Sequence, residues 1–399
     1  MPIWATALAA TFTIQAVGAF LLFSVPVIGP LLTARAGVSA ETIGYLSSIM
    51  SGGICWFLAG GGPMLERFGA IRLLQIGLIL CALGFAGIGY GWWPLAVVGA
   101  LVLGFGYGTN SPAGSQTLSR TAPPGHRVLI FSLKQAGVPL GAALSGLVIA
   151  PLAATYGLEA AVGLAVGVSL LAILAVQPTR RALDDEQTAT RRFDWVRALL
   201  SWRTVVRSIA LLKGHQALPM LTALGVAFAI LQACLTAFLV TYVVTRHGFT
   251  LAQGGMVAAV LQGSNLVARI VLGWLADRLG DSMRHLSVQA LVAAAALVAL
   301  ALYVPDSPGD PLLYLLVALA GFTGISWNGI HMAEVARLAP SGRVSDVTSA
   351  AALFGFTGSV AGPLLFAWGV TLTGSYALVY CAVAGQLALM GLLCWRVRA

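Results

Sequence analysis

The stretches Gly62-Pro63-Met64-Leu65-Glu66-Arg67-Phe68-Gly69 and Gly273-Trp274-Leu275-Ala276-Asp277-Arg278-Leu279-Gly280 follow one pattern. In each, a glycine is followed four residues later by an acid, then by an arginine and, two residues on, by a second glycine. One charged hairpin therefore stands in each half of a chain that is otherwise mostly apolar. Two copies of one motif predict a duplicated architecture.

Composition places the chain in a lipid bilayer. Hydrophobic residues make up 59% of its 399 residues and charged residues 9%, and the mean hydropathy is +0.91. So few charged side chains cannot cover the surface of a water-soluble protein of this length. The five cysteines lie inside apolar stretches without a CxxC spacing, and we interpret them as packing residues.

Twelve apolar stretches are long enough to span a membrane, because a hydrocarbon core of about 30 Å needs about 20 helical residues. The first has no basic leading region and no small-residue cleavage site after it, so we expect it to remain as a helix. The predicted spans are 7–33, 41–62, 72–91, 94–118, 128–154, 157–177, 218–244, 251–275, 285–304, 311–336, 345–370 and 373–395.

One long polar segment, 178–216, separates the sixth and seventh spans. We predict that it links an N-terminal bundle, 1–177, to a C-terminal bundle, 217–399. Its second part, 193–212, alternates arginines with apolar side chains, as an amphipathic helix on a membrane surface does. A plain solvated tether is the other interpretation, and both remain open.

Positive charge predicts the orientation in the membrane. With the N-terminus inside, 18 of the 22 lysines and arginines fall on the inner side, and the outer loops hold only Arg35 and Arg246. The positive-inside rule therefore places both termini in the cytoplasm, in a bacterial inner (plasma) membrane. Anionic lipid of the inner leaflet explains the net charge of +9, so we expect no nucleic-acid partner.

The halves also match outside the two hairpins. Gly104-Phe105 stands 16 residues before Arg120, and Gly321-Phe322 stands 16 residues before Arg337. Equivalent positions at three separate places are offset by 211, 217 and 216 residues. One register relating three places indicates that a helical bundle has been duplicated.

These features resemble the major facilitator superfamily, whose signature G-x-L-x-D-R-x-G, with basic residues after it, follows helices 2 and 8. The second hairpin fits that signature, whereas the first has Met64 for leucine, Glu66 for aspartate and Ala70-Ile71 for the basic pair. The resemblance covers the whole chain. It implies an all-α membrane protein of twelve helices in two pseudo-symmetric six-helix bundles, which rock about a central site so that it opens to one side at a time.

The two hairpins are predicted to form a breakable latch on the cytoplasmic side. The carboxylate of Glu66 or Asp277 would accept hydrogen bonds from the start of the opposing helix 11 or 5, and from Arg120 or Arg337. The alternative is a set of ordinary interfacial charges that mark helix ends. The predicted latch residues are Gly62, Glu66, Arg67, Gly69, Arg120, Gly273, Asp277, Arg278, Gly280, Arg337 and Asp346, with Glu334 beside them.

Two cations lie inside predicted spans, Lys134 in the fifth and Arg269 in the eighth, and no carboxylate lies near the centre of any span. On insertion scales each such charge costs about 2.5–3.5 kcal/mol. An anionic substrate would offset this cost, because a charge contact at about 4 Å is worth roughly 4 kcal/mol at an effective dielectric near 20. Snorkelling of both side chains to the inner headgroups is the alternative interpretation.

Other polar residues share helix faces with these cations or lie in the spans that line the cavity in the resembling family. Arg269 continues a face that also carries Gln262 and Asn265, at spacings of three and four residues. His331, with Glu334 one turn on, is a candidate for proton coupling, and a packing histidine is the alternative. Further predicted substrate contacts, or else hydrogen bonds between helices, are Gln15, Asn110, Gln232, Trp327 and Asn328.

Arg269 followed by G-x-L-x-D-R resembles helix 8 of the monocarboxylate and oxalate/formate transporters, where an arginine at this place meets the substrate carboxylate. The resemblance implies a carboxylate substrate for this chain. Lys134 adds a second cation in helix 5, which suits a dicarboxylate or a monoanion that neutralises one cation.

The sequence therefore predicts a secondary active transporter of a small organic anion, a mono- or dicarboxylate, that works with protons or by exchange. A proton-coupled multidrug efflux antiporter is the first alternative, although the chain lacks a deep acid for cationic drugs. An intramembrane enzyme is a distant alternative, because His331 and Glu334 have no third ligand and no nucleophile motif accompanies them. We expect a monomer with no catalytic residue, cofactor or metal.

Overall fold

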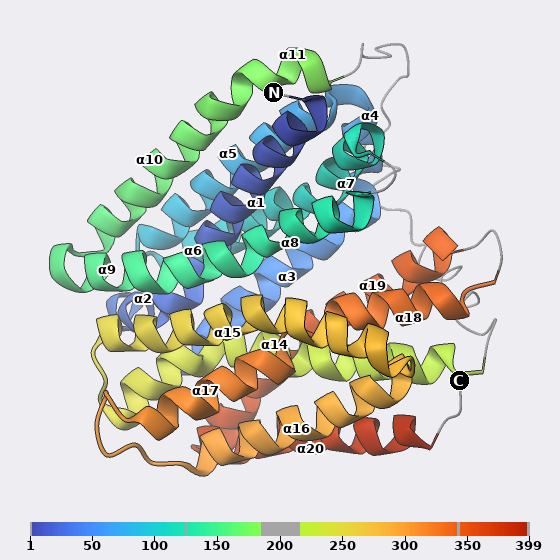
Figure 1. The fold of residues 1–399 in the computed structure, drawn as a ribbon. Coiled ribbons are helices and arrows are strands. Elements are labelled where there is room, and N and C mark those ends of the chain that lie inside the picture. Colours follow the sequence, from blue (N-terminus) through green and yellow to red (C-terminus); the bar gives the residue numbers. More distant parts are fainter. Residues whose placement is uncertain (1, 124–125, 185–215, 341–343, 397–399) are drawn as a thin grey trace. The chain divides into compact units, whose positions relative to one another are not determined.

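The computed structural model describes residues 2–123, 126–184, 216–340 and 344–396. Within these ranges the chain is helical and contains no β-strand (Figure 1). The predicted amphipathic segment 193–212 lies outside the described residues. The helical content of the described ranges confirms the predicted all-α membrane protein.

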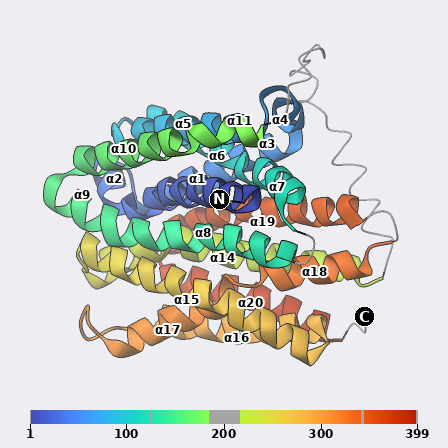
Figure 2. The same ribbon diagram turned by 45° about the horizontal axis from the view of Figure 1, so that its top comes forward.

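The chain divides into two compact units, Met1–Val38 with Ile49–Ser201 and Ser39–Ser48 with Trp202–Ala399. The helices of each unit run side by side (Figure 1, Figure 2). From the N-terminus to the linker the elements are α1 (Ile3–Val27), α2 (Gly29–Ala36), η1 (Ala40–Thr42), α3 (Ile43–Gly60), α4 (Gly62–Phe68), α5 (Ala70–Gly89), α6 (Trp93–Gly108), α7 (Asn110–Thr121), α8 (Arg127–Leu144), η3 (Ser145–Ile149), α9 (Ala150–Tyr156), α10 (Leu158–Val176), η4 (Gln177–Thr179) and α11 (Arg180–Leu183). After the linker they are α14 (Leu218–His247), α15 (Leu251–Leu279), α16 (Ser282–Leu302), α17 (Pro311–Gly324), α18 (Asn328–Leu338), α19 (Val344–Thr373) and α20 (Tyr376–Trp395).

Equivalent helices make the same packing pairs in both units. In the first, α1 packs against α8, α6 against α5, and α10 against α5. In the second, α14 packs against α19, α17 against α16, and α20 against α16. The internal match of the two sequences therefore extends to how their helices pack.

Glycines allow close contact between α5 and α6 in the first unit. A Cβ atom on Gly84 of α5 would lie 2.5 Å from the carbonyl oxygen of Gly99 in α6, and one on Gly99 would lie 2.6 Å from that of Gly84. Gly77 and Gly106 make a second reciprocal pair at 2.6 and 2.5 Å. Any larger residue would push the two backbones apart, so these small residues allow α5 and α6 to pack closely within lipid.

Eleven stretches of the described chain are long and apolar enough to cross a membrane. The predicted span 94–118 is not among them because it is divided into α6 and α7, of 16 and 12 residues, on either side of Thr109. Leucines along α10, such as Leu171 and Leu174, are exposed, as lipid-facing side chains are. The chain is therefore a multi-pass membrane protein.

The break at Thr109 has a counterpart in the second unit. Ser326, 217 residues later, lies between α17 and α18. Both hydroxyls donate back to their own helix, Thr109 Oγ1 to the carbonyl of Gly106 at 2.9 Å and Ser326 Oγ to that of Phe322 at 2.5 Å. Such back-bonding can bend a helix. It accompanies the division in both units, but hydroxyls inside undivided helices, such as Ser24 and Thr236, bond back in the same way.

Candidate functional site

Lys134 on α8 is buried among the helices of the first unit. Its side chain is 3% exposed, and Nζ donates to the backbone carbonyl oxygen of Asn110 on α7 at 3.0 Å. Gly114, one turn further along α7, makes room for it, since an added Cβ would lie 2.7 Å from Lys134 Cε and 2.8 Å from Nζ. The ammonium therefore sits inside protein and does not extend along the surface toward headgroups.

Amide side chains on α1, α7 and α8 of the same unit form further hydrogen bonds. Gln15 on α1 donates from Nε2 to Oε1 of Gln135 on α8 at 2.8 Å, and Asn110 donates from Nδ2 to the carbonyl of Tyr107 at 3.1 Å. Because a carbonyl only accepts, the second bond fixes the orientation of the Asn110 amide. Asn110 Oδ1 is buried and has no hydrogen-bond partner among the residues that the structure describes. Helices α7 and α8 thus bring together two predicted substrate contacts, Asn110 and Lys134, while Gln15 on α1 bonds to the residue after Lys134.

The lysine has an acceptor but no described counter-ion. Nζ carries three N–H donors, and the carbonyl of Asn110 takes one of them. No carboxylate among the described side chains lies within 4 Å of Nζ, since the ion pairs found among them join other residues. A positive charge therefore lies in a low-dielectric interior with a neutral carbonyl as its described hydrogen-bond partner, an arrangement that attracts an anion.

A hydrogen-bonded ladder runs along α15 in the second unit. Asn265 donates from Nδ2 to Oε1 of Gln262 at 3.3 Å and accepts at Oδ1 from Nε of Arg269 at 3.3 Å. Gln262 and Asn265 are 4% and 1% exposed. The structure thus places the three residues on one helix face, as the spacing predicted, and Asn265 orients the guanidinium of Arg269.

A second polar cluster of this unit joins α14 to the start of α18. Trp327 donates from Nε1 to Oε1 of Gln232 at 2.9 Å and stacks on Phe228 at 5.4 Å between ring centroids. Its ring also meets His331 edge-on at 5.3 Å. Asn328 is exposed and takes no part in these contacts. Two of the predicted contacts, Gln232 and Trp327, therefore bind each other.

His331 is held in one tautomer by a backbone oxygen. Its Nε2 lies 2.9 Å from the carbonyl oxygen of Leu221, which can only accept, so Nε2 carries the proton. Nδ1 is then a bare acceptor, and it is buried without a hydrogen-bond partner in the described part of the chain. Gly225 allows this approach, because an added Cβ would lie 2.5 Å from Nε2. Nδ1 is therefore the ring nitrogen that remains open to a further hydrogen-bond donor.

Glu334 pairs with an arginine of its own helix. Its two carboxylate oxygens accept from Nε and Nη2 of Arg337 at 2.9 and 2.6 Å. The side chain of Glu334 is 4% exposed and that of Arg337 is 59% exposed. Such a forked, charge-assisted pair is strong, and it occupies the carboxylate predicted to assist His331.

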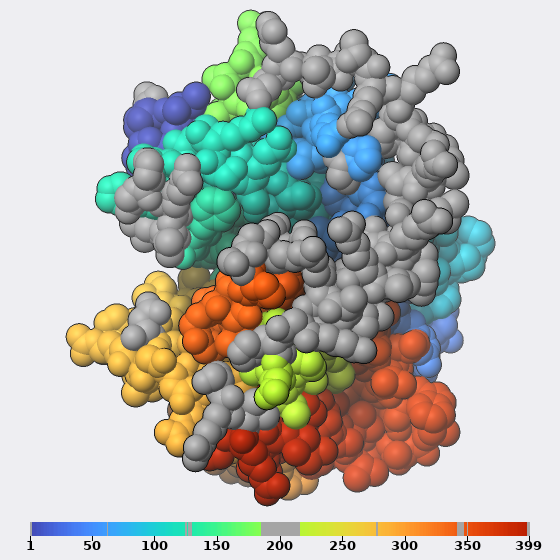
Figure 3. Space-filling view, turned by 90° about the vertical axis from the view of Figure 1, so that its right-hand side faces the viewer, coloured from blue at the N-terminus to red at the C-terminus, as the bar shows by residue number. Residues whose placement is uncertain are grey.

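The two signature hairpins differ in their surroundings. In the first unit α4 lies against α7, and the space-filling view shows light-blue atoms of α4 beside teal atoms of α7 (Figure 3). Glu66 and Arg120 are exposed there, and Arg67 lies over the ring of Phe68 at 5.6 Å. In the second unit Arg278 covers the ring of Trp274 at 4.3 Å.

The remaining latch residues have fewer described contacts. Gly62 begins α4, and an added Cβ on Gly273 or Gly280 would meet nothing within 4 Å. The side chains of Asp277 and Asp346 lie outside the described residues. The latch between the halves therefore stays a prediction.

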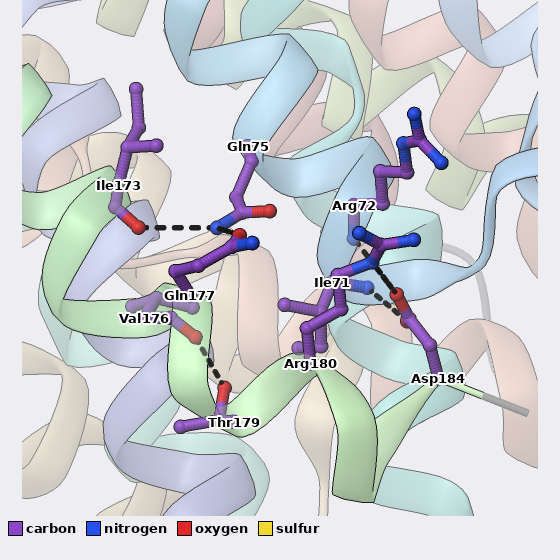
Figure 4. A network of polar contacts seen from close by, with 9 residues as sticks. All are labelled: Ile71, Arg72, Gln75, Ile173, Val176, Gln177, Thr179, Arg180 and Asp184. Atoms are coloured by element: carbon purple, nitrogen blue, oxygen red, sulfur yellow. Dashed lines mark hydrogen bonds and ion pairs between the residues drawn. The ribbon is translucent and has the colours of Figure 1, made fainter.

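Sequence reasoning missed Asp184, which it placed in the linker. Figure 4 shows its carboxylate at the start of α5, where it accepts from the backbone N–H groups of Ile71 and Arg72 at 2.7 and 3.2 Å. Arg180 lies one turn before it, with Nε 3.5 Å from Oδ2. An acid four residues after an arginine was the available signal, but it indicates only a helical pair.

The described residues contain no group of three or more histidine, cysteine, aspartate or glutamate side chains able to hold a metal ion. All five cysteines are free, and three of them are buried. The predicted substrate-binding and proton-coupling residues with described contacts in the helices are two cations, five amides, the indole of Trp327, the imidazole of His331 and the paired carboxylate of Glu334.

Comparison with known proteins gives a family match along most of the chain. The family model described as Major Facilitator Superfamily matches residues 7–363. An uncharacterized MFS-type transporter of Mycobacterium tuberculosis is 25% identical over 317 residues, which cover 78% of this chain and 66% of the relative. The chain thus spans slightly less than two thirds of that relative's length.

Two shorter matches and one structure carry further detail. A probable nitrate/nitrite transporter of Mycobacterium tuberculosis is 33% identical over 157 residues, 39% of each chain. A hexuronate transporter of Bacillus subtilis is 26% identical over 129 residues, 32% of this chain and 30% of the relative. The crystal structure of a peptide transporter POT in complex with sulfate superposes with a TM-score of 0.78 at 16% identity, covering 98% of this chain and 93% of that one.

Proposed function

Because this chain belongs to the Major Facilitator Superfamily, we propose that it is a secondary active transporter of a small organic anion. It carries a mono- or dicarboxylate by alternating access, coupled to protons or to a counter-anion. It works as a monomer in the bacterial inner membrane with both termini in the cytoplasm, and it has no enzymatic activity.

The burial of Lys134 without a counter-ion carries this proposal. An ammonium that has one carbonyl acceptor and is 3% exposed costs several kcal/mol, and a carboxylate brought by the cargo removes much of that cost. The bundle holds this charge in place through Gly114 and Asn110, which position it before any cargo arrives. A preorganised cation of this kind favours an anion over a neutral or cationic cargo.

Arg269 supports the same charge preference from the second unit. A guanidinium presents a planar fork that matches a carboxylate, and Asn265 holds the Nε side of that fork. The nitrate/nitrite and hexuronate transporters to which parts of the chain are similar are both named for anions. These observations favour the anion over the lipophilic cations that a multidrug efflux antiporter moves.

Unpartnered acceptors favour a cargo that also donates hydrogen bonds. Asn110 Oδ1 and His331 Nδ1 are both buried, both are fixed as acceptors by backbone carbonyls, and neither has a described donor. A hydroxyl or amino group on the cargo would supply one, whereas nitrate and simple fatty acids would not. We therefore propose a hydroxylated or aminated carboxylate, with Nδ1 of His331 as the alternative acceptor for a coupled proton.

Uptake into proteoliposomes tests the proposal. The panel contains nitrate, acetate, malate and D-glucuronate, together with one lipophilic cation, each with and without a pH gradient. We expect malate or D-glucuronate to enter fastest. We also expect Lys134→Met and Arg269→Gln each to lower the initial rate at least about tenfold, because each removes a charge contact worth a few kcal/mol.

Arg284→Gln is the matched control. It removes one positive charge from an exposed side chain and should leave uptake within about twofold of wild type. Uptake of the lipophilic cation with no anion transported would establish the efflux alternative. Full anion uptake by Lys134→Met would remove the main support for an anionic cargo.

A further inference from the structure

Helix α5 begins without a capping side chain of its own. Its N-cap residue is Gly69, and its first turn contains no acid. The first N–H groups of a helix have no partner within the helix, and a carboxylate placed there gains from both hydrogen bonding and the helix dipole. The start of α5 therefore needs an acceptor from elsewhere in the chain.

Asp184 supplies that acceptor from 113 residues away. Oδ1 accepts from the N–H of Ile71 at 2.7 Å and Oδ2 from the N–H of Arg72 at 3.2 Å, so both oxygens are used (Figure 4). The side chain is 7% exposed, and the Nε atom of Arg180 lies 3.5 Å from Oδ2. Residues after the last span of the first unit thus cap the helix that follows the first signature hairpin.

The second signature glycine creates the space for this carboxylate. Gly69 has φ +79° and ψ 163°, a conformation that residues with a side chain rarely adopt. A Cβ atom there would lie 2.8 Å from Cγ of Asp184 and 3.0 Å from Oδ1. Glycine at this position therefore allows the positive φ of the turn and leaves room for the carboxylate of Asp184.

In the second unit, the corresponding helix α16 is capped by a residue next to it in the sequence. Gly280 also has a positive φ, +70°, but nothing lies within 4 Å of an added Cβ. The next residue, Asp281, caps α16 itself by accepting from the N–H of Arg284 at 3.0 Å. At the offset of 211 residues, Asp281 corresponds to Ala70, which cannot cap. The start of α5 is thus capped by a distant segment, whereas the start of α16 is capped locally.

A second tie lies one turn further along α5. Gln75, which is 6% exposed, donates from Nε2 to the carbonyl of Ile173 at 3.1 Å and to Oε1 of Gln177 at 2.9 Å (Figure 4). Leu183, next to Asp184, is also buried. The end of α10 and the short α11 are therefore joined to α5 at two successive turns.

We propose that Asp184 is a positioning residue. It holds α11, where the chain leaves the first unit, against the start of α5, which follows the first signature hairpin. The hydrogen bonds from Ile71 and Arg72 to Asp184 hold α4, the start of α5 and α11 together. When α10 moves, the hairpin therefore moves with it. The exchange and proteolysis tests of this assignment do not depend on the cargo, so their failure would leave the proposed function standing, and the reverse is also true.

Hydrogen–deuterium exchange of the purified full chain in lipid nanodiscs tests the bond. In Asp184→Ala the amides of Ile71 and Arg72 should exchange about tenfold faster, the effect of losing a helix cap. Peptides covering 62–68 and 177–184 should exchange faster in the same variant. Trypsin should also cleave faster after Arg180 and Arg181, as mapped by mass spectrometry.

Asp281→Ala is the matched control, because it removes a helix cap without touching α11. It should speed exchange only at the start of α16 and leave cleavage after Arg180 unchanged. Asp184→Glu should restore most of the protection, because it retains both acceptor oxygens. The inference is overturned if Ile71 and Arg72 exchange at the wild-type rate in Asp184→Ala, or if Asp281→Ala loosens α11 equally.

A transport readout separates positioning from simple helix stability. If D-glucuronate is carried, its maximal uptake rate per folded protein should fall several-fold in Asp184→Ala with KM within about twofold of wild type, and Asp184→Glu should recover it. An equal fall in Asp281→Ala would show that loss of any cap suffices, and would overturn the positioning role.

Discussion

Lys134 donates from Nζ to the backbone carbonyl oxygen of Asn110 across 3.0 Å, although the two residues lie 24 positions apart and on different helices. The contact exists because α7 presents no side chain at Gly114, where the aliphatic end of the lysine lies. The position of the charge is therefore set by a missing side chain on the neighbouring helix. This arrangement leads to a direct test with a single methyl group.

Gly114→Ala should displace the ammonium of Lys134. The new Cβ would lie 2.7 Å from Cε and 2.8 Å from Nζ, so the lysine must move away from Asn110. We expect a loss of about 1–3 kcal/mol in the free energy of unfolding, as for other overpacked interiors, together with slower anion uptake. Gly163→Ala on α10 is the control, because nothing lies within 4 Å of its new methyl group. Equal melting temperatures for the two variants would contradict the conclusion that Gly114 makes room for Lys134.

Gly225→Ala should break the bond that fixes the tautomer of His331. Its Cβ would lie 2.5 Å from Nε2, which must then leave the carbonyl of Leu221. We expect a cost of about 1–3 kcal/mol, because the buried Nε2–H of His331 loses its acceptor as the ring is displaced. The matched variant Gly329→Ala adds a methyl group in open space and should be neutral or slightly stabilising. Thermal unfolding of the two variants in one detergent makes the comparison.

Arg337→Ala should destabilise the protein more than Glu334→Gln does. Removing the exposed arginine strands a carboxylate that is 4% exposed, whereas the glutamine variant removes that buried charge. Breaking a buried pair from one side costs about 3–5 kcal/mol, and we expect less here because half of the pair is in solvent. The double variant should recover part of the loss. Additive effects of the two single changes in melting temperature would count against a coupled pair.

Tyr303→Phe should change the pH dependence of stability near the start of α17. The Tyr303 hydroxyl donates to Oδ2 of Asp310 at 2.5 Å, which lowers the pKa of Asp310 and raises the pKa of Tyr303 to about 12. The stabilisation from Asp310 is present above its unfolded pKa, near 4, and is lost as the pH falls through its lower folded pKa. The stabilisation from Tyr303 is present below its unfolded pKa, near 10, and is lost as the pH rises through the folded value.

The measurement for this pair is the difference in melting temperature between wild type and Tyr303→Phe across the pH range. We expect a constant difference from about pH 5 to pH 9 that shrinks above about pH 10 and below about pH 4. A difference that does not vary with pH would show that the hydroxyl acts through packing alone.

Periodicity and composition were sufficient for the features that depend on a single helix. Residues at spacings of three and four share one face, so Gln262, Asn265 and Arg269 were predicted together and form one ladder. Hydropathy predicted one span over 94–118, whereas the structure divides this segment into α6 and α7 at Thr109. A hydropathy window averages over a whole span and does not record a local break in the helix.

Features that depend on contact between helices appeared only with the tertiary structure. The sequence by itself determined a duplicated helical membrane protein with two cations inside its predicted spans, because the number of apolar stretches and the positions of charges are properties of the chain. The fold decided three further features. These are the partner of Lys134, the tautomer of His331 and the position of the Asp184 carboxylate at the start of α5. Each depends on a glycine that lets a distant segment approach to within 3 Å of a Cβ position, and linear sequence does not record which segment that is.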